Sequence, residues 1–325
     1  MKIELNKNKV YFNNGSLKKE IHPFWLRERV DGEEFLDKGT QQRLFDPTSL
    51  DSEILINRAY INDEFLEIDF NDGVNSKLNI NKLALEFSNE DIIIKSIPKT
   101  KWDSTLKNIK NYEYQDNFFE SKEMHDLLVS FYKYGFVIIK NIPTNNNFIV
   151  KFANSIGSVK KTNFGEYFDV KSKPNPNDLA YTSLNLSPHT DNPYRNPVPC
   201  IQLLHCIENE VSGGLSTLVD GFTVTEDLKN ENLKFYKILC DVKVRFRFID
   251  KEVVLEDWSE LIKLNDDKTF KQVRFSPRMD YVPILDKEKL DLYYKARKKL
   301  SEMYNSEKYK IEFKLIPKDL MMIDN

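Results

Sequence analysis

The segment Ser187-Pro-His-Thr-Asp191, with the pair Gly213-Gly214 downstream of it, is the most informative part of this chain. It presents an imidazole, from His189, and a carboxylate, from Asp191, on one extended stretch. These are two of the three ligands of a 2-His-1-carboxylate iron site, which keeps open metal positions for other groups. No histidine follows His205, so a second imidazole ligand downstream is not in the sequence.

The composition indicates a globular protein with a real hydrophobic core. The chain has 325 residues, of which 40% are hydrophobic and 12% aromatic, and this length suits two domains. Its 48 Lys and Arg are interspersed with 51 Asp and Glu, giving a net charge of -3. This pattern is typical of a solvated surface and lacks the basic footprint of nucleic-acid binding.

The cysteines and the N-terminal sequence bear on location. Three cysteines, all after residue 199, argue against a disulfide framework and favour a reducing compartment. The start, MKIELNKNKV, has no apolar signal segment, and no apolar run is long enough to span a membrane. We therefore expect a cytoplasmic protein that acts on a small molecule, without nucleic-acid or membrane partners.

Residues 1–98 are predicted to form a small β-rich N-terminal domain. Short apolar segments alternate with turns, and Asn13-Asn14-Gly15 and Asn71-Asp72-Gly73 are typical of hairpin turns. Pro98 to Thr105 is the predicted boundary. The expected strands are Lys2–Leu5, Ile54–Ile61, Phe65–Phe70 and Ile92–Ile94. One helical turn is expected at Leu83–Phe87.

Residues 99–325 are predicted to form a second domain, mainly β with helices. Helical spacing of apolar residues begins after Ser121, and a helix is expected from Asn147 to Ile156. From Tyr181 onward the pattern is mostly strand-like, interrupted by one long helix from about Lys287 to Tyr304. The expected strands are 135–140, Gln202–Cys206, Ser216–Asp220, Val242–Phe248, Gln272–Phe275 and Ile311–Ile316.

The predicted fold class is therefore α+β, with a double-stranded β-helix (jelly roll) following the small N-terminal domain. A β-rich region with few helices and a ligand pair at a strand end is typical of a double-sheet jelly roll.

Several longer motifs resemble the γ-butyrobetaine dioxygenase and trimethyllysine dioxygenase family, within the taurine-dioxygenase-like Fe(II)/2-oxoglutarate oxygenases. The resemblance covers nearly the whole chain. The motifs are Ala180-Tyr-Thr-Ser-Leu-Asn-Leu-Ser-Pro-His-Thr-Asp191, Ile201-Gln-Leu-Leu-His-Cys206, Gly213-Gly-Leu-Ser-Thr-Leu-Val-Asp-Gly-Phe222, His22-Pro-Phe-Trp-Leu-Arg27 with Gln42-Arg43-Leu44, Phe275-Ser-Pro-Arg278 and Pro317-Lys-Asp-Leu-Met-Met-Ile-Asp-Asn325.

The sequence departs from this family in two places. Family members continue past the Asp324-Asn325 pair into the second iron histidine, and then to an arginine that binds the far carboxylate of 2-oxoglutarate. We therefore expect a chain truncated at its C-terminus, rather than a natural pseudoenzyme. Some relatives also hold a structural zinc through N-terminal cysteines; residues 26–45 contain none, so no structural zinc is expected.

The resemblance implies a set of cofactors and the residues that contact them. It assigns Fe(II) to His189 and Asp191, with 2-oxoglutarate and O2 as co-substrates. It also implies that Ser216 and Leu204 lie near 2-oxoglutarate; an ordinary hairpin turn is the alternative for Ser216. Members of the family tend to pair, so a homodimer is an expectation that the sequence does not decide.

The same resemblance implies a substrate with a trimethylammonium group. Such a cation has no N–H donors, so aromatic faces must bind it. Phe164, Phe168 and Tyr181 fall where the family has its aromatic cage, and Tyr194 could add a wall; core packing is the alternative. Ser276 and Arg278 fall near the position that handles the substrate's carboxylate, and for them a surface salt bridge is the alternative.

The remaining histidines are not expected to be ligands. His205 lies in an apolar strand, and the family has a non-ligand histidine at that position. His22 and His125 have no partner motif, so a helix cap or exposure to solvent is expected for both.

The leading hypothesis is a 2-oxoglutarate-dependent hydroxylase that converts γ-butyrobetaine to carnitine. Trimethyllysine or a trimethylaminoalkyl phosphonate are the alternative substrates. A non-catalytic jelly-roll binding protein that lacks the third ligand is an alternative of another class. A zinc hydrolase is a further one, although it would need a third ligand and a base that no other histidine supports.

Overall fold

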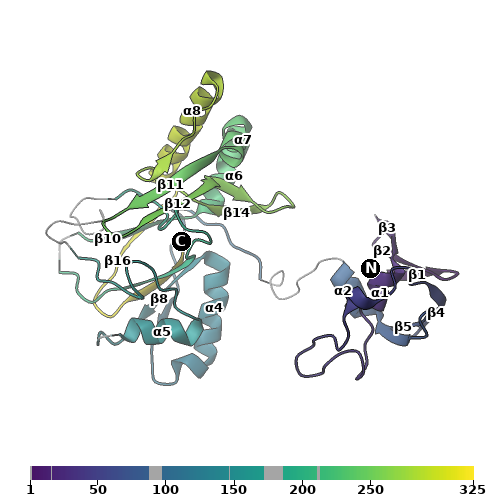
Figure 1. The fold of residues 1–325 in the computed structure, drawn as a ribbon. Helices are drawn as coiled ribbons and strands as arrows, with labels where there is room; N and C mark the ends of the chain where they lie inside the picture. Colours follow the sequence, from purple (N-terminus) through teal and green to yellow (C-terminus); the bar gives the residue numbers. More distant parts are fainter. Residues whose placement is uncertain (1, 16, 88–96, 146, 172–185, 211–212) are drawn as a thin grey trace. The chain divides into compact units, whose positions relative to one another are not determined.

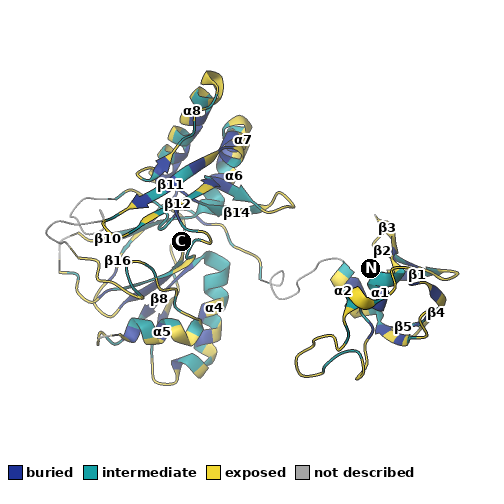
Figure 2. Cartoon of the chain, viewed as in Figure 1, coloured by how far each residue is buried: buried dark blue, intermediate teal, exposed yellow. Residues whose placement is uncertain are grey.

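The computed structural model divides the chain into two compact units, Met1–Ser96 and Ile97–Asn325. It describes all residues except 1, 16, 88–96, 146, 172–185 and 211–212. The division lies two residues before the boundary expected from the sequence. Each unit has its own buried core (Figure 2).

The described residues of the N-terminal unit form two antiparallel three-stranded sheets, two short α-helices and one 3-10 turn (Figure 1). The strands are β1 (Lys2–Asn6), β2 (Lys9–Asn13), β3 (Lys18–Ile21), β4 (Ile56–Asn62), β5 (Phe65–Phe70) and β6 (Asn75–Asn79); the helices are α1 (Pro23–Arg27), the 3-10 turn η1 (Pro47–Ser49) and α2 (Ile80–Phe87). Val10, Leu26 and Leu66 are fully buried in a shared core.

Both predicted hairpin turns are confirmed. Asn13 pairs with Lys18 across the β2–β3 hairpin, and the amide of Phe70 donates to the carbonyl of Val74 at the start of the β5–β6 hairpin. Gly15 and Gly73 have φ of 89° and 86°, a left-handed conformation that glycine adopts without steric cost. The predicted strand Ile92–Ile94 lies outside the described residues.

The C-terminal unit is organised around a four-stranded sheet with the order β7-β8-β17-β9. The strands are β7 (Asn111–Glu113), β8 (Phe136–Lys140), β17 (Leu320–Asp324) and β9 (Ile201–His205); only β7 and β8 pair in parallel. Every β17 residue from Leu320 to Ile323 is paired with one residue of β8 and one of β9. The last strand in sequence is therefore a central strand of the sheet.

The two faces of this sheet cover different layers, because alternate side chains of a strand point to opposite sides. Val137, Ile139 and Leu203 face the helices α4 (Lys122–Tyr134) and α5 (Phe148–Ile156). Ile138 and Leu204 face the two-stranded sheet of β10 (Leu215–Val219) and β16 (Lys310–Lys314). The second face of the sheet and this strand pair therefore pack together through a second apolar cluster.

A third layer packs helices against smaller sheets. Figure 1 shows the long helix α8 beside α7, and their contacts with the strands form the largest core. Its elements are α6 (Gly221–Glu231), α7 (Leu233–Asp241), α8 (Lys287–Tyr304), β11 (Lys243–Ile249), β12 (Val254–Glu260), β13 (Ile262–Leu264), β14 (Phe270–Val273) and β15 (Asp280–Tyr281); η2 (Phe118–Glu120) precedes α4.

The long helix is confirmed at its predicted bounds, but the prediction that it alone interrupts the strands after Tyr181 is wrong. α6 and α7 also occur there. Asp220 caps α6 by accepting from the amide of Phe222, and Asn232 caps α7 by accepting from the amide of Phe235. These two capping residues, followed by apolar positions at helical spacing, were the overlooked signal.

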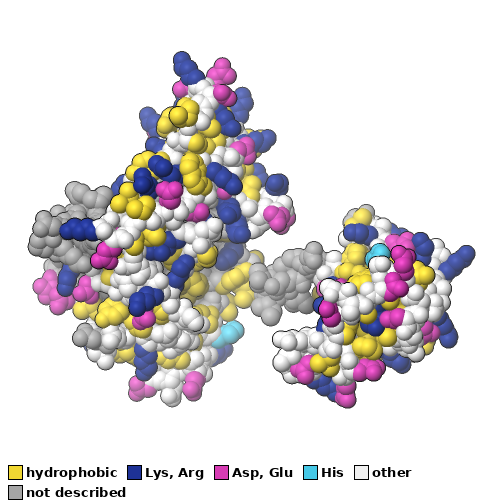
Figure 3. All heavy atoms as spheres, viewed as in Figure 1, with side chains coloured by type: hydrophobic (Ala, Val, Ile, Leu, Met, Phe, Trp, Pro, Cys, Tyr) yellow, Lys and Arg dark blue, Asp and Glu magenta, His cyan; other side chains and the backbone are white. Residues whose placement is uncertain are grey.

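Charged side chains are interspersed over the visible surface. Figure 3 shows Lys and Arg among Asp and Glu over both units on the face in view, as the composition predicted. None of the helices in the described ranges is both long and apolar enough to cross a membrane.

Adjacent leucines in α4 allow a matched test of the helix-covered face. Leu127 is fully buried against the sheet, whereas Leu128 is 37% exposed. We expect Leu127→Ala to lower the free energy of unfolding of the C-terminal unit by about 2–5 kcal/mol, because it removes buried methyl groups and leaves a cavity. Leu128→Ala should change it by less than about 0.5 kcal/mol. Urea denaturation followed by circular dichroism measures both, and equal losses would contradict the assigned helix face.

Candidate metal and substrate site

His189 and Asp191 lie together beside the four-stranded sheet. The Nε2 atom of His189 is 3.2 Å from Oδ1 of Asp191, and Nδ1 of the same ring is 2.8 Å from the carbonyl of Ser187. A carbonyl only accepts, so Nδ1 carries a proton; Nε2 donates to Asp191 when the ring is protonated, and it has a lone pair for a metal ion once that second proton is lost. The pair thus presents a nitrogen and an oxygen donor to one point, as two metal ligands must.

Each member of the pair shifts the pKa of the other. The hydrogen bond to Asp191 raises the pKa of His189, although burial and the positive charge of Arg278 oppose this. Burial raises the pKa of Asp191, but the contacts with His189, the hydrogen bond from Gln202 and the charge of Arg278 together bring it below its ordinary value. The carboxylate is therefore in its anionic, ligand form at neutral pH.

Backbone and side-chain hydrogen bonds join the segment around His189 and Asp191 to Arg274 and Phe275, which follow β14 and directly precede the predicted substrate residue Ser276. The amide of Thr190 donates to the carbonyl of Phe275 at 2.8 Å, and the amide of Phe275 donates to Oγ1 of Thr190 at 3.0 Å. The buried guanidinium of Arg274 donates to the carbonyl of Pro193 at 3.0 Å and forms an ion pair with Asp257. Residues on both sides of Asp191 are therefore held in place.

Two further residues contact Asp191 directly. The side-chain Oδ1 of Asn325 accepts a hydrogen bond from the amide of Asp191 at 2.7 Å. The Nε2 of Gln202 donates to Oδ2 of Asp191 at 3.0 Å. Asn325 follows β17 and Gln202 lies in β9, so two paired strands of the central sheet position one carboxylate.

The predicted 2-oxoglutarate residues face a common space. Leu204 packs with Leu218 and Phe313 between the sheets. Ser216 is paired with Phe313 and lies two residues before Leu218, so its side chain points to the same face of β10. The structure thus brings Leu204 and Ser216 to the same inter-sheet space; their contact with a co-substrate stays a prediction.

Three of the predicted cage residues form an aromatic cluster. The ring centroids of Phe164 and Phe168 are 5.4 Å apart, Phe164 is 5.6 Å from Phe248, and Tyr194 stacks on Phe248 at 5.1 Å. Phe248, a residue of β11, was not singled out from the sequence. The fourth predicted cage residue, Tyr181, lies outside the described residues.

A polar bridge connects this aromatic cluster to the ligand segment. Arg195 donates through Nε to Oδ1 of Asn192 at 3.0 Å and through its guanidinium to Asn163. Asn192 directly follows Asp191, and Asn163 directly precedes Phe164. The hydroxyl of Tyr194 also donates to Oδ1 of Asn192, at 3.0 Å.

Ser276 and Arg278, predicted to handle the substrate's anion, follow Phe275, the residue that contacts Thr190. Ser276 is buried, and its Oγ has no hydrogen-bond partner among the described residues. Arg278 is exposed, and its charge lowers the pKa of both His189 and Asp191. No ion pair of Arg278 occurs within the described ranges.

The other histidines lie away from this pair. His205 is on β9 with Leu203, on the helix-covered face, whereas Gln202 and Leu204 point to the opposite face. His22 caps α1 by accepting from the amide of Phe24, as expected, and His125 is exposed beside Asp126. In the part of the chain that the structure describes, no group of three or more His, Cys, Asp or Glu side chains is arranged to hold a metal ion.

The residues missed by sequence reasoning share one property. Gln202, Arg274 and Asn325 were all within quoted motifs or next to them, yet no role was inferred for any. Their partners are between 11 and 134 residues away along the chain. Only the tertiary fold reveals such contacts, and a polar residue inside an apolar strand, such as Gln202, was the one available signal.

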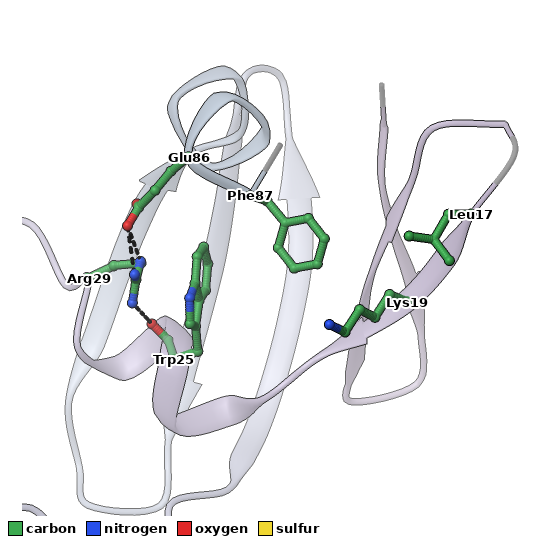
Figure 4. A pocket seen from close by; sticks show the side chains of 6 residues that line it. All are labelled: Leu17, Lys19, Trp25, Arg29, Glu86 and Phe87. Atoms are coloured by element: carbon green, nitrogen blue, oxygen red, sulfur yellow. Dashed lines mark hydrogen bonds and ion pairs between the residues drawn. The ribbon is translucent and has the colours of Figure 1, made fainter. Parts of the chain in front are cut away.

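The N-terminal unit has a separate pocket of about 340 Å³ (Figure 4). Arg29 lies 3.6 Å from the centroid of the Trp25 ring, and its guanidinium also contacts Glu86 and the carbonyl of Trp25. Phe87 meets Trp25 edge-on. These contacts already occupy the polar groups of Arg29, so the pocket is described as a structural feature of this unit.

Comparisons with known proteins identify relatives across most of the chain. It is 26% identical over 310 residues to the γ-butyrobetaine dioxygenase of Pseudomonas sp. (strain AK-1), covering 94% of this chain and 81% of that protein. It is 29% identical to the γ-butyrobetaine dioxygenase of Homo sapiens, covering 69% of this chain and 59% of that protein. It is 27% identical to the mitochondrial trimethyllysine dioxygenase of Bos taurus, covering 70% of this chain and 54% of that protein.

The chain therefore spans less than two thirds of the length of these two mammalian relatives. Residues 105–325 match the family described as taurine catabolism dioxygenase TauD, TfdA. This range contains the His189–Asp191 pair, the residues that hydrogen-bond to the segment around it, and the aromatic cluster. The chain belongs to the TauD/TfdA family of dioxygenases.

Proposed function

We propose that this protein is an Fe(II)- and 2-oxoglutarate-dependent dioxygenase that hydroxylates a small trimethylammonium acid, with γ-butyrobetaine, giving carnitine, as the first candidate substrate. The observation that carries the proposal is the 3.2 Å approach of His189 Nε2 to Asp191 Oδ1, with the histidine tautomer fixed by Ser187. Membership of a dioxygenase family and the named relatives support it.

The donor set suits Fe(II). An unprotonated imidazole nitrogen and an anionic carboxylate are two members of the ligand face that non-haem iron oxygenases use. His189 and Asp191 would hold the metal; the described residues place no third His, Cys, Asp or Glu side chain with this pair. When bound, Fe(II) with 2-oxoglutarate and O2 supplies the oxidising power that replaces a substrate C–H bond by C–OH.

The protein's own residues would bind and orient the two organic molecules. We propose that the Ser216 hydroxyl and the Leu204 side chain contact 2-oxoglutarate in the space between the sheets, within a jelly-roll domain. We propose that Phe164, Phe168 and Tyr194, with Tyr181, bind the cation, since aromatic faces attract a charge that has no donors to offer. Holding the substrate carbon near the metal converts a bimolecular step into an effectively intramolecular one.

A second substrate class is favoured by Arg278. Its guanidinium is exposed and close enough to lower the pKa of both candidate ligands, so it lies on the side where the substrate's anion would be. Arginine pairs with carboxylates and phosphonates through two parallel hydrogen bonds. γ-Butyrobetaine also carries a carboxylate, so this arginine would favour an alternative only through the charge of the anionic end; trimethyllysine and trimethylaminoalkyl phosphonates are the alternative substrates.

The first test is succinate release by the full-length protein loaded anaerobically with Fe(II) and then exposed to O2. We expect release coupled to γ-butyrobetaine to exceed release with trimethyllysine or a trimethylaminoalkyl phosphonate, and to be lost in His189→Ala. His205→Gln is the matched control and should retain turnover, because its ring lies on the other face of β9. Absence of coupled turnover with all three substrates, despite bound Fe(II), would favour the non-catalytic binding protein.

Metal affinity should depend on pH through His189. A metal ion competes with the proton on Nε2, and Asp191 raises the pKa of this ring above its ordinary 6.5. Below that raised pKa, we expect affinity for Co²⁺, used in place of Fe(II), to fall about tenfold or more for each pH unit; above it, the dependence should flatten. Calorimetric titrations between about pH 5 and pH 8 measure this. The His205→Gln variant should give the same profile, and a flat profile for the wild type would argue against ligation by His189.

The aromatic cluster predicts a specific loss of substrate affinity. Phe168 is 45% exposed, the most accessible of its described members. We expect Phe168→Leu to raise KM for the trimethylammonium substrate by roughly 2- to 30-fold, the range that corresponds to ~0.5–2 kcal/mol for one aromatic face. KM for 2-oxoglutarate should not change. Tyr167→Leu, which alters the exposed neighbouring ring, is the control, and equal effects of the two substitutions would contradict a role for Phe168 in the cage.

A further inference from the structure

We propose that Gln202 and Asn325 are positioning residues that hold Asp191 so that it presents only Oδ1 to a metal ion. This inference rests on the proposed function, because it concerns the same carboxylate. It goes beyond that function by giving a role to two residues outside the candidate ligand set.

Gln202 occupies the second oxygen of the carboxylate. Its Nε2 lies 3.0 Å from Oδ2 of Asp191, while Oδ1 of the same carboxylate lies 3.2 Å from Nε2 of His189. Only the amino end of the glutamine amide can pair with a carboxylate oxygen, since its other end is an acceptor too. Oδ2 is therefore engaged by the protein, and Oδ1 is the oxygen that shares one side with the imidazole nitrogen.

The orientation of the Gln202 amide is set by its hydrogen bond to Asp191. Its Oε1 is buried and has no protein donor within the described ranges. Buried acceptors are usually paired, and an unpaired one lowers stability. Rotating the amide would place Oε1 against the anionic Oδ2, which is worse, so the side chain's orientation is set by Asp191.

Asn325 fixes the backbone of the same residue. Its side-chain Oδ1 accepts from the amide of Asp191 at 2.7 Å, and its own backbone amide donates to the carbonyl of Cys200 at 3.0 Å. In the β17–β9 register, Ile323 is opposite Gln202 and Asp324 is opposite Ile201. Strand pairing therefore sets the spacing of the two contacts, one to the backbone and one to the carboxylate.

Single-oxygen ligation has a chemical consequence. A carboxylate that binds through both oxygens takes two positions around a metal, whereas one that binds through Oδ1 alone takes one. Facial 2-His-1-carboxylate sites depend on open positions for their other reactants. The hydrogen bond from Gln202 would thus keep one more position open and also fix the direction of the carboxylate, as outer partners of metal ligands commonly do.

The test compares Co²⁺ binding by the full-length wild type and the Gln202→Met variant, in which a side chain of similar length lacks the N–H donor. Calorimetry gives the affinity, visible absorption of bound Co²⁺ reports the coordination, and thermal melting of the metal-free protein reports the fold. We expect affinity to fall roughly 10- to 100-fold, the absorption of bound Co²⁺ to change, and the melting temperature to stay close to that of the wild type.

A matched control is available in β14. Gln272 also has a buried Nε2, but this atom has no hydrogen-bond partner in the described part of the chain. Gln272→Met should therefore leave both the affinity and the Co²⁺ absorption unchanged. If Gln202→Met does not fold, Gln202→Asn replaces it; this variant keeps the amide but is one carbon shorter, and the same loss of affinity is expected.

The outcomes separate this inference from the proposed function. Failure of the wild type to bind Co²⁺ would overturn the metal site, and with it the proposed function. Binding by the wild type, with the same affinity and absorption in the Gln202 variant, would overturn only the positioning role. An equal change in Gln272→Met would show a general effect of the substitution and would also overturn it.

Discussion

The insertion of β17 between β8 and β9 is the constraint on which the C-terminal unit depends. Its side chains complete both faces of the central sheet: Leu320 and Met322 face the helices, and Met321 faces the β10–β16 pair. At its start, the 1% exposed Asp319 accepts from Lys140 and from the amide of Ile316. Immediately after its end, Asn325 holds the amide of Asp191. The same strand therefore contributes side chains to the buried core and, through the residue after it, holds the candidate ligand Asp191 in position.

This arrangement couples the site to long-range folding. Lys140 and Asp319 are 179 residues apart in sequence, so closing the sheet requires a large loss of chain entropy before its contacts form. Within the segment Thr190–Pro193, only Asn192 bonds to close neighbours in sequence, Tyr194 and Arg195. The other hydrogen bonds of this segment go to Gln202, Arg274, Phe275 and Asn325, and they form only when the sheets are assembled. The geometry of the site is thus a property of the completed unit.

The sequence predicted those features that have a local physical cause. The strand after Gly135 was evident because this glycine ends α4 in a left-handed conformation and four buried residues follow it. The bounds of α8 followed from its helical spacing, and the hairpins from Asn-Gly and Asp-Gly turns. The His189–Asp191 pair could also be predicted, because the two residues are close in sequence. The contacts of Asp191 with Gln202 and Asn325 could not, since they depend on strand pairing; the polar Gln202 in an apolar strand was the one local signal of either contact.

His205 shows why strand direction matters more than residue type. Apart from His189 itself, it is the histidine closest in sequence to Asp191. The strand Ile201-Gln-Leu-Leu-His205 is mostly apolar, so the sequence shows no alternation that would tell on which face of the sheet His205 lies. The structure supplies this information through Leu203, which packs with the helices, and Leu204, which packs between the sheets. Because side chains alternate, His205 must share the face of Leu203. Burial there lowers the pKa of His205 and keeps its ring neutral.

The charges around the pair constrain how the proposed substrate would lie. Arg278 adds positive charge near His189 and Asp191, so a trimethylammonium group on that side would meet both like-charge repulsion and a bound metal cation. The aromatic cluster of Phe164, Phe168, Phe248 and Tyr194 offers ring faces that attract a cation, and the guanidinium of Arg195 already lies 5.7 Å from the centroid of the Tyr194 ring. Arg195 ties Asn163, beside the cluster, to Asn192, beside the ligand, and so keeps the two environments at a fixed separation. A zwitterion would therefore bind with its cation at the rings and its anion toward Arg278, which places the carbons between its two charged ends closest to the metal ligands.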